Sequence, residues 1–438
     1  MTAPLAARLA GELDELGLAP GTWLVAVSGG PDSVALLLLM ADIAAERGLA
    51  LVVAHADHGI HPDSAAVATR VERLADTLGL PATIGRLELG AGATETDARA
   101  ARYAWLRGER ARLGAHGIIT GHHADDQVET VLMRVLRGSG PAGLAGMPRR
   151  SWDLVRPLLP FRREELAQYL LERGADAWRD PANTDSRHLR SWLRAEVLPA
   201  LEARLPDVAP RLLRLSEQAR IERDAWDEVL DRLEGLALRV EQTRISLDAR
   251  TLATLGHGLA SQLVRTAARR LGQVVSVAAA RRAVRLARDG SSGRRADLGD
   301  GWTAELAFGR LVLGPSVPGE ADRSLPGEGE CRWGGWLLTL GSGPAQPVER
   351  RGWRTWLPHA DISVGALREG ERLRPLGGTG SRLIVRLLQE ARVPRGERMA
   401  WPVLRLDGNP VWVPGVSRSG SSVPEVGQEA VRIDVQRA

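Results

Sequence analysis

Residues 22–27 read TWLVAV, and residues 28–33 read SGGPDS. The first run is apolar with β-branched and aromatic residues, which predicts a buried strand, and the apolar residues after Pro31 predict a helix over Asp32–Glu46. Glycines at the junction let successive N–H groups converge on an anion, and the helix N-terminus adds its dipole. The stretch predicts an anion-binding loop, although a capped turn would read similarly. Its residues are Ser28, Gly29, Gly30, Pro31, Asp32 and Ser33.

The residues around this loop repeat the strand-then-helix pattern. We expect strands at Ala50–Ala56, Pro81–Leu89 and Gly117–Thr120, and helices at Ala65–Gly79, Glu95–Leu113 and Asp125–Leu136. Strands that alternate with helices of this length indicate an α/β fold with a doubly wound parallel sheet. Such sheets bind ligands beyond the carboxyl ends of their strands, which is where the loop lies.

The 438 residues suggest about three domains. We expect a catalytic α/β domain over 1–208, a mainly helical middle domain over 209–313, a linker and β segment over 314–358, and a smaller α+β domain over 359–438. In the last domain a helix is expected at Ser381–Glu390.

All 58 Lys and Arg residues are arginines, against 54 acidic residues, giving a net charge of +4. Without lysine, the chain can carry neither a Walker A loop nor a pyridoxal Schiff base. The one cysteine, Cys331, can form neither an internal disulfide nor a cysteine-based zinc site, which favours a reducing compartment. No signal peptide and no membrane-length apolar run is evident, so we expect a cytoplasmic protein.

Positive charge is concentrated in two segments. Ser261–Arg295 has nine arginines against one acidic residue, and Arg368–Arg398 has eight against four. Guanidinium groups match phosphate geometry, so these segments suggest a polyanionic partner such as nucleic acid. Solvated helix faces are the alternative.

A second motif, GHHADDQVET, spans Gly121–Thr130. Asp126 and Glu129 lie three residues apart, on one face of the expected helix. Paired carboxylates at a sheet edge can hold an ammonium group, a metal ion or a water molecule. The same spacing is that of a capping box, and His122, His123 and Asp125 leave zinc binding open as a further alternative.

The loop SGGPDS resembles that of the PP-loop, or N-type ATP pyrophosphatase, superfamily. The run GHHADDQVETVLMRVLRGSGPAGLAGM over 121–147 is similar to the tRNA(Ile)-lysidine synthetase family. Further similarity lies at His58-Gly59, Glu95–Tyr103, Arg156–Leu159, Asp180–Asn183 and Gly370–Gly415. The chain departs from that family's pattern at His61, where the family has Arg, and at Ser191, where it has Asn.

This resemblance implies an enzyme that uses ATP to adenylate the C2 oxygen of the wobble cytidine in a CAU-anticodon tRNA(Ile). The ε-amine of free L-lysine then displaces AMP to form lysidine. The resemblance further implies that the PP-loop residues hold ATP, that Asp32 holds Mg²⁺ through the phosphates, and that Arg99 and Arg102 reach phosphates. Asp126 and Glu129 are the candidates for binding lysine. The candidates for binding tRNA are Arg190, Arg194, Arg269, Arg270, Arg382 and Arg386, with the last two on one helical face.

The composition and the two motifs disfavour other functions of PP-loop and RNA-binding proteins. Thiolating PP-loop enzymes carry sulfur on cysteines or an iron–sulfur cluster, which one cysteine outside the catalytic region disfavours. GMP and asparagine synthetase types need a glutaminase domain or partner. A non-catalytic RNA-binding protein would explain the basic segments but not two motifs at strand ends. A homodimer is one arrangement that the sequence leaves open.

Overall fold

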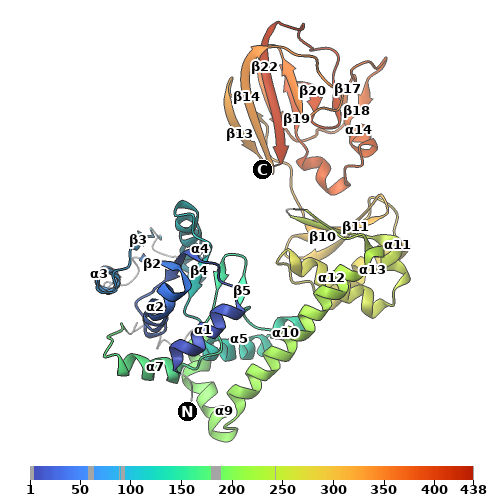
Figure 1. The fold of residues 1–438 in the computed structure, drawn as a ribbon. Coiled ribbons are helices and arrows are strands. Elements are labelled where there is room, and N and C mark those ends of the chain that lie inside the picture. The colour runs from blue at the N-terminus through green and yellow to red at the C-terminus, as the bar shows by residue number, and fades with distance from the viewer. Residues whose placement is uncertain are drawn as a thin grey trace. The chain divides into compact units, whose positions relative to one another are not determined.

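The computed structural model describes residues 4–57, 64–87, 89, 94–178, 189–241 and 243–437. The chain divides into two compact units, Met1–Ala225 and Trp226–Ala438, which are described in turn (Figure 1). No helix in the described ranges is long and apolar enough to cross a membrane.

The first unit is built on a six-stranded sheet with the order β3-β2-β1-β4-β6-β5. The strands are β1 (Gly21–Ala26), β2 (Leu49–Asp57), β3 (Ala82–Arg86), β4 (Ile118–Thr120), β5 (Arg150–Ser151) and β6 (Leu154–Val155). All neighbours are parallel except β5 and β6, which form an antiparallel edge. The predicted parallel sheet is therefore confirmed, with one antiparallel strand at its edge.

Helices cover both faces of this sheet, which is why its central strands are apolar on both sides. Trp23 and Val25 of β1 join one core with α1 (Leu5–Glu15), α2 (Pro31–Ala44), α3 (Ser64–Thr77) and α7 (Arg163–Glu172). Leu24 joins the core on the other face with α4 (Glu95–Arg112). The alternation along β1 thus produces the doubly wound arrangement and places the turns after β1 and β4 at one edge.

The rest of the first unit is helical. α5 (Ala124–Leu136) follows β4, and the short α6 (Pro141–Leu144) follows α5. After the segment that is not described, α8 (Leu189–Trp192) passes through a π turn at Leu193–Val197 into α9 (Leu198–Arg204), and α10 spans Val208–Arg232.

The second unit contains the helices α11 (Ala249–Thr254), α12 (His257–Arg270) and α13 (Val277–Asp289). They pack on an antiparallel sheet of order β7-β8-β11-β10-β9. Its strands are β7 (Arg239–Glu241), β8 (Arg244–Asp248), β9 (Arg295–Gly299), β10 (Trp302–Ala307) and β11 (Arg310–Pro315). Beside the expected helices, the middle region therefore contains a five-stranded sheet that the sequence analysis does not predict. Asp300-Gly301 and Phe308-Gly309 both have positive φ, as two-residue hairpin turns require, and they fold residues 295–315 into strands.

Two further antiparallel sheets enclose one core near the C-terminus. The first has the order β12-β16-β19-β20-β21, and the second has the order β13-β14-β22-β15. The strands of the first are β12 (Arg323–Ser324), β16 (Ile362–Gly365), β19 (Val403–Leu406), β20 (Asn409–Val413) and β21 (Ser417–Arg418). Those of the second are β13 (Gly329–Trp333), β14 (Trp336–Pro344), β15 (Arg354–Leu357) and β22 (Glu429–Arg437). This region is thus mostly antiparallel sheet.

The single longer helix of this region, α14, spans Ile384–Glu390. Arg382 precedes it and lies in β18 (Arg382–Leu383), which pairs with β17 (Arg372–Leu373). The prediction that Arg382 and Arg386 share one helical face is therefore wrong, because a strand pair occupies the residues where the helix was expected to begin.

Gly85 of β3 tests the packing of α4 on the sheet. A Cβ atom there would lie 2.1 Å from the Trp105 ring, so Gly85→Ala should lower the free energy of unfolding by about 1–3 kcal/mol through overpacking. Gly108→Ala in exposed α4 meets nothing within 4 Å and should raise it by about 0.5–1 kcal/mol. Denaturant unfolding of the two variants measures both changes in the free energy of unfolding. Equal effects would contradict the close contact of Gly85 with the Trp105 ring.

Candidate active site

The loop between β1 and α2 has the geometry that the sequence predicts. Gly29 has φ +85°, and a Cβ atom there would lie 2.6 Å from Val67, so glycine is required. Gly30 caps α2, and Pro31 is its first residue. The Ser33 hydroxyl accepts the Ser28 N–H at 3.1 Å and donates to the Gly30 carbonyl at 2.8 Å. The fold of the loop is therefore held by its own serines, and the N-terminus of α2 is left at the sheet edge.

The turn after β4 touches this loop directly. A Cβ atom on Gly121 would lie 3.0 Å from the Asp32 carbonyl oxygen and 3.3 Å from the Ser33 Cα. A side chain on residue 121 would force one of the two backbones to shift by a few tenths of an ångström. Because β1 and β4 are parallel neighbours, the two sequence motifs meet at one edge of the sheet.

His123 links the two motifs and is completely buried. It precedes α5: its Nδ1 lies 3.2 Å from the Asp125 nitrogen and 3.5 Å from Asp125 Oδ2, while the Asp126 carboxylate accepts the His123 N–H. Its Nε2 lies 3.4 Å from Asp32 Oδ2 and 3.6 Å from Asp126 Oδ2. Burial alone would lower the pKa of His123, but Asp125, Asp32 and Asp126 outweigh it and raise the pKa to about 9. In turn, His123 more than offsets the burial of Asp32, so the pKa of Asp32 is lowered.

The neighbouring His122 behaves in the opposite way. It contacts the Thr120 hydroxyl at 2.9 Å. Burial lowers the pKa of His122 to about 3; Asp126 opposes this shift, and Arg156, Arg99 and Arg190 add to it. Adjacent histidines thus differ in charge near neutral pH, and Arg99 lies close enough to the site to act on one of them.

Asp126 and Glu129 meet two arginines from a distant part of the chain. Glu129, 1% exposed, accepts Arg194 Nε at 2.6 Å and Nη2 at 2.9 Å, and also Arg190 Nε at 2.7 Å. Arg190 Nη2 reaches across to Asp126 Oδ1 at 2.8 Å. Arg163 adds a contact to Glu129 at 3.6 Å. Asp126 also belongs to a capping box of α5, but its partner there is His123 and not Glu129 as the spacing suggested. This carboxylate therefore serves the helix and the cluster at once.

Two other residues of the second motif hold the site in place. Asp125 accepts Arg162 Nη2 at 2.8 Å and the Arg163 N–H at 2.7 Å, which ties α5 to the start of α7. The Gln127 side chain accepts the Met147 N–H at 2.8 Å and donates to the Met147 carbonyl at 3.1 Å. This pair fixes the glycine-rich turn after α5, where Gly146 lies against the Gln127 amide.

The structure brings together most of the residues expected at the site. The PP-loop, Asp126, Glu129, Arg190 and Arg194 lie in the first unit, and Arg99 packs over the Tyr103 ring. The remaining candidates, Arg269, Arg270, Arg382 and Arg386, lie in the second unit. His58-Gly59, His61 and Asp180–Asn183 fall outside the described residues. The sequence analysis names His123 only as a zinc candidate. Its place two residues before an expected helix was the available signal for capping.

The site offers one carboxylate, Asp32, to a magnesium ion. Asp32 is part-exposed at the loop and has no hydrogen bond to Arg, whereas the Asp125 and Asp126 carboxylates are committed to protein donors. No group of three His, Cys, Asp or Glu side chains suited to a metal occurs in the part of the chain that is described. A single carboxylate is compatible with Mg²⁺ carried on substrate phosphates, and not with a zinc cage.

The two histidines give opposite titrations. With selective ¹³C labelling of the nine histidines, one resonance should titrate near pH 9 and vanish in His123→Asn, while the His122 resonance should stay neutral to below pH 4. Since the folded pKa of His123 exceeds its ordinary value of 6.5, its stabilising contribution is complete below pH 6.5 and is lost as pH rises through about 9. Titration of both residues near pH 6.5 would contradict this arrangement.

Two parts of the chain match known protein families. Residues 4–201 match the PP-loop domain family, and residues 362–435 match the TilS substrate C-terminal domain family. The tRNA(Ile)-lysidine synthase of Symbiobacterium thermophilum is 35% identical and covers 94% of each chain. That of Alkalilimnicola ehrlichii is 36% identical over 91% of this chain and 90% of its own. That of Azoarcus sp. is 31% identical over 98% and 95%. With relatives of this identity along nearly its whole length, the chain belongs to the tRNA(Ile)-lysidine synthase family.

Proposed function

We propose that the chain is a ligase that joins free L-lysine to C2 of the wobble cytidine in CAU-anticodon tRNA(Ile), with ATP converted to AMP and pyrophosphate. The observation that carries this proposal is the junction of an anion-binding loop and a carboxylate–arginine cluster at one sheet edge, linked by His123. The family of its full-length relatives supports the same activity.

ATP is proposed to lie at the PP-loop, with its phosphates toward Ser28, Gly29, Gly30, Pro31 and Ser33. The N–H groups at the start of α2 would hold the pyrophosphate as it leaves. Asp32 would hold Mg²⁺, which neutralises charge on the leaving phosphate oxygens when bound. Arg99 would contact a phosphate from the neighbouring helix, since its guanidinium makes no hydrogen bond within the described residues and lies near His122.

Lysine is proposed to bind at Asp126 and Glu129. Both carboxylates already pair with Arg190 and Arg194, so the ammonium group would replace a guanidinium group there. The ε-amine attacks C2 only when neutral, and one of the carboxylates would accept its proton. The C2–N bond then forms as the bond from C2 to the adenylate oxygen breaks, and AMP leaves. A freed arginine could pair with an anion of the substrate.

The tRNA is proposed to contact Arg190 and Arg194 near the site, and Arg269, Arg270, Arg382 and Arg386 in the second unit. Arg269 and Arg270 pair with Asp227, and Arg382 pairs with Glu390, so phosphates would compete with these carboxylates. On α13, Arg281 and Arg285 are exposed and one turn apart. They offer phosphate contacts without that competition.

We also propose the domain limits, the cellular location and the oligomeric state. The domain limits are 1–208, 209–313, 314–358 and 359–438, with tRNA binding assigned to the middle and final domains. A tRNA substrate and one buried free cysteine fit a cytoplasmic enzyme. A homodimer stays a prediction.

The activity is tested by incubating the chain with ATP, Mg²⁺, labelled lysine and tRNA(Ile) transcripts that carry a CAU anticodon. We expect lysine in the tRNA, with one AMP formed for each lysine, and no transfer when the wobble cytidine is replaced by uridine. Asp32→Asn should abolish AMP formation because it removes the carboxylate at the loop. Asp76→Asn, an exposed change on α3, is the matched control. Sulfide-dependent AMP release instead of lysine transfer would overturn the proposal.

Asp126→Asn separates lysine binding from adenylation. The change keeps an oxygen that can cap α5 but loses the charge that an ammonium group needs. We expect the KM for lysine to rise about tenfold or more, the loss expected for a charge-assisted hydrogen bond, while tRNA-dependent AMP formation persists. Glu196→Gln, an exposed acid on the same helical segment as Arg194, should change neither. An unaltered KM for lysine would place the amino acid elsewhere.

A further inference from the structure

The four-stranded sheet near the C-terminus turns one polar face away from the core. Leu338, Leu340, Ile433 and Val435 point into the core, so the residues between them point outward. Thr339 of β14, Asp434 of β22 and Arg354 of β15 are register partners and form one row across three strands. On the same face, Trp356 follows Arg354 by two residues in β15, and Gln436 follows Asp434 by two residues in β22.

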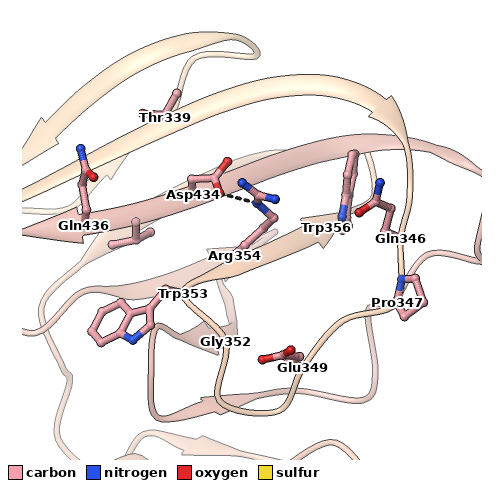
Figure 2. Close-up of a pocket in the computed structure, with 11 residues that line it drawn as sticks. Thr339, Gln346, Pro347, Glu349, Gly352, Trp353, Arg354, Trp356, Asp434 and Gln436 are labelled. Atoms are coloured by element: carbon pink, nitrogen blue, oxygen red, sulfur yellow. Dashed lines mark hydrogen bonds and ion pairs between the residues drawn. The ribbon is translucent and has the colours of Figure 1, made fainter.

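A hollow of about 640 Å³ lies on this face. The loop before β15 forms its wall, with Gln346, Pro347, Glu349 and Gly352. Figure 2 shows Arg354, paired with Asp434, between Trp353 at one end and Trp356 at the other. Such a hollow is open to solvent along the sheet and bounded by an aromatic ring at each end.

Trp353 is a preformed aromatic platform. It is 47% exposed, yet its ring stacks on Trp336 at 5.7 Å and an interplanar angle of 20°. Trp336 packs edge-on against Trp401 at 4.9 Å, and both buried indoles donate to backbone carbonyls. The ring also lies against Gly415, where a Cβ atom would be 2.4 Å away. An exposed indole held this firmly loses little conformational entropy when a planar ligand stacks on it.

The polar groups around the hollow suit a nucleotide. Within the described residues, the side chains of Thr339, Gln346 and Gln436 make no hydrogen bond to the protein, so their donors and acceptors are available to a base edge. Arg354 lines the hollow, and Arg432 pairs with Asp434 of its lining. Their guanidinium groups offer donors to a phosphate of the same nucleotide.

We propose that this hollow binds one unpaired nucleotide of the RNA substrate, with its base stacked on Trp353. Sheet faces with exposed aromatic rings recognise splayed-out bases in this way, and a base in a duplex has no free face to offer. The proposal rests on the proposed tRNA substrate and adds a binding site for it, far along the chain from the catalytic motifs.

The test is the affinity of the full chain for labelled tRNA(Ile) at 50 and 200 mM salt. Trp353→Ala should raise the Kd about 5- to 150-fold, the range expected for one lost base stack, and by the same factor at both salts. Trp353→Phe should recover part of the loss. Trp152→Ala, a change at a fully exposed tryptophan in the first unit, is the matched control. The paired change Arg281→Gln with Arg285→Gln should instead flatten the salt dependence, because it removes phosphate contacts.

Dimethyl sulfate and carbodiimide probing of the bound tRNA reports which bases the protein protects. This pattern would not change if Trp353 only stabilised the fold. Wild-type protein should protect one unpaired base that Trp353→Ala leaves reactive, and the melting temperatures of the two proteins should agree. If Trp353→Ala melts early, Gln436→Ala serves as the second variant, with the same base losing protection. Wild-type affinity and protection in the variants, or a loss that fades with salt, would overturn the proposal.

A single-stranded RNA hexamer of mixed sequence separates this inference from the proposed function. If the wild-type chain binds the hexamer in a Trp353-dependent manner but transfers no lysine, the nucleotide site stands and the ligase proposal fails. If it transfers lysine while Trp353→Ala binds hexamer and tRNA normally, the ligase stands and the nucleotide site fails. Binding of a proline-rich peptide in place of RNA would also reject the nucleotide.

Discussion

The buried carboxylate of Glu129 is the constraint on which the catalytic region depends. It is almost completely removed from water and is compensated by guanidinium groups from two other segments, α7 and the helix that holds Arg190 and Arg194. A charge buried this deeply is tolerated only when it is paired, and removing one partner of such a pair typically costs about 3–5 kcal/mol. The pairing therefore draws residues some 60 positions later in the sequence to the carboxyl edge of the sheet.

The first unit could be predicted well because its signals are local. Apolar strands, a Gly-Gly turn and amphipathic helices each lie within a few residues, and the parallel order of the sheet follows from their alternation. The same locality placed Asp126 and Glu129 on one helix face. Sequence spacing could not reveal what these carboxylates contact, since their partners are arginines beyond the segment that is not described. Arg190 and Arg194, which the sequence analysis proposes for tRNA binding, contact these carboxylates in the structure.

The second unit was harder to predict because its elements depend on turns rather than on periodicity. Asp300-Gly301 is a recognisable hairpin signal, with positive φ at both residues. The sequence before it has helical spacing and is rich in arginine, so a helical region was predicted and the sheet was not. Arginine also proved a poor guide to binding by count alone. Arg270 and Arg288 use their donors on acidic or backbone groups within the unit, and Arg418 is fully buried among backbone carbonyls that satisfy it. Clustered charge in the sequence therefore overstates the charge left for a partner.

The guanidinium groups over Asp126 and Glu129 have a consequence for the order in which ligands arrive. Two bare carboxylates beside the PP-loop would repel a triphosphate, whereas the cluster with Arg190 and Arg194 in place carries no excess negative charge. On the proposed function, ATP can therefore enter first, and lysine then exchanges one cation for another without changing the total charge of the cluster. The site acts as an ion exchanger whose resting counter-ions are its own side chains.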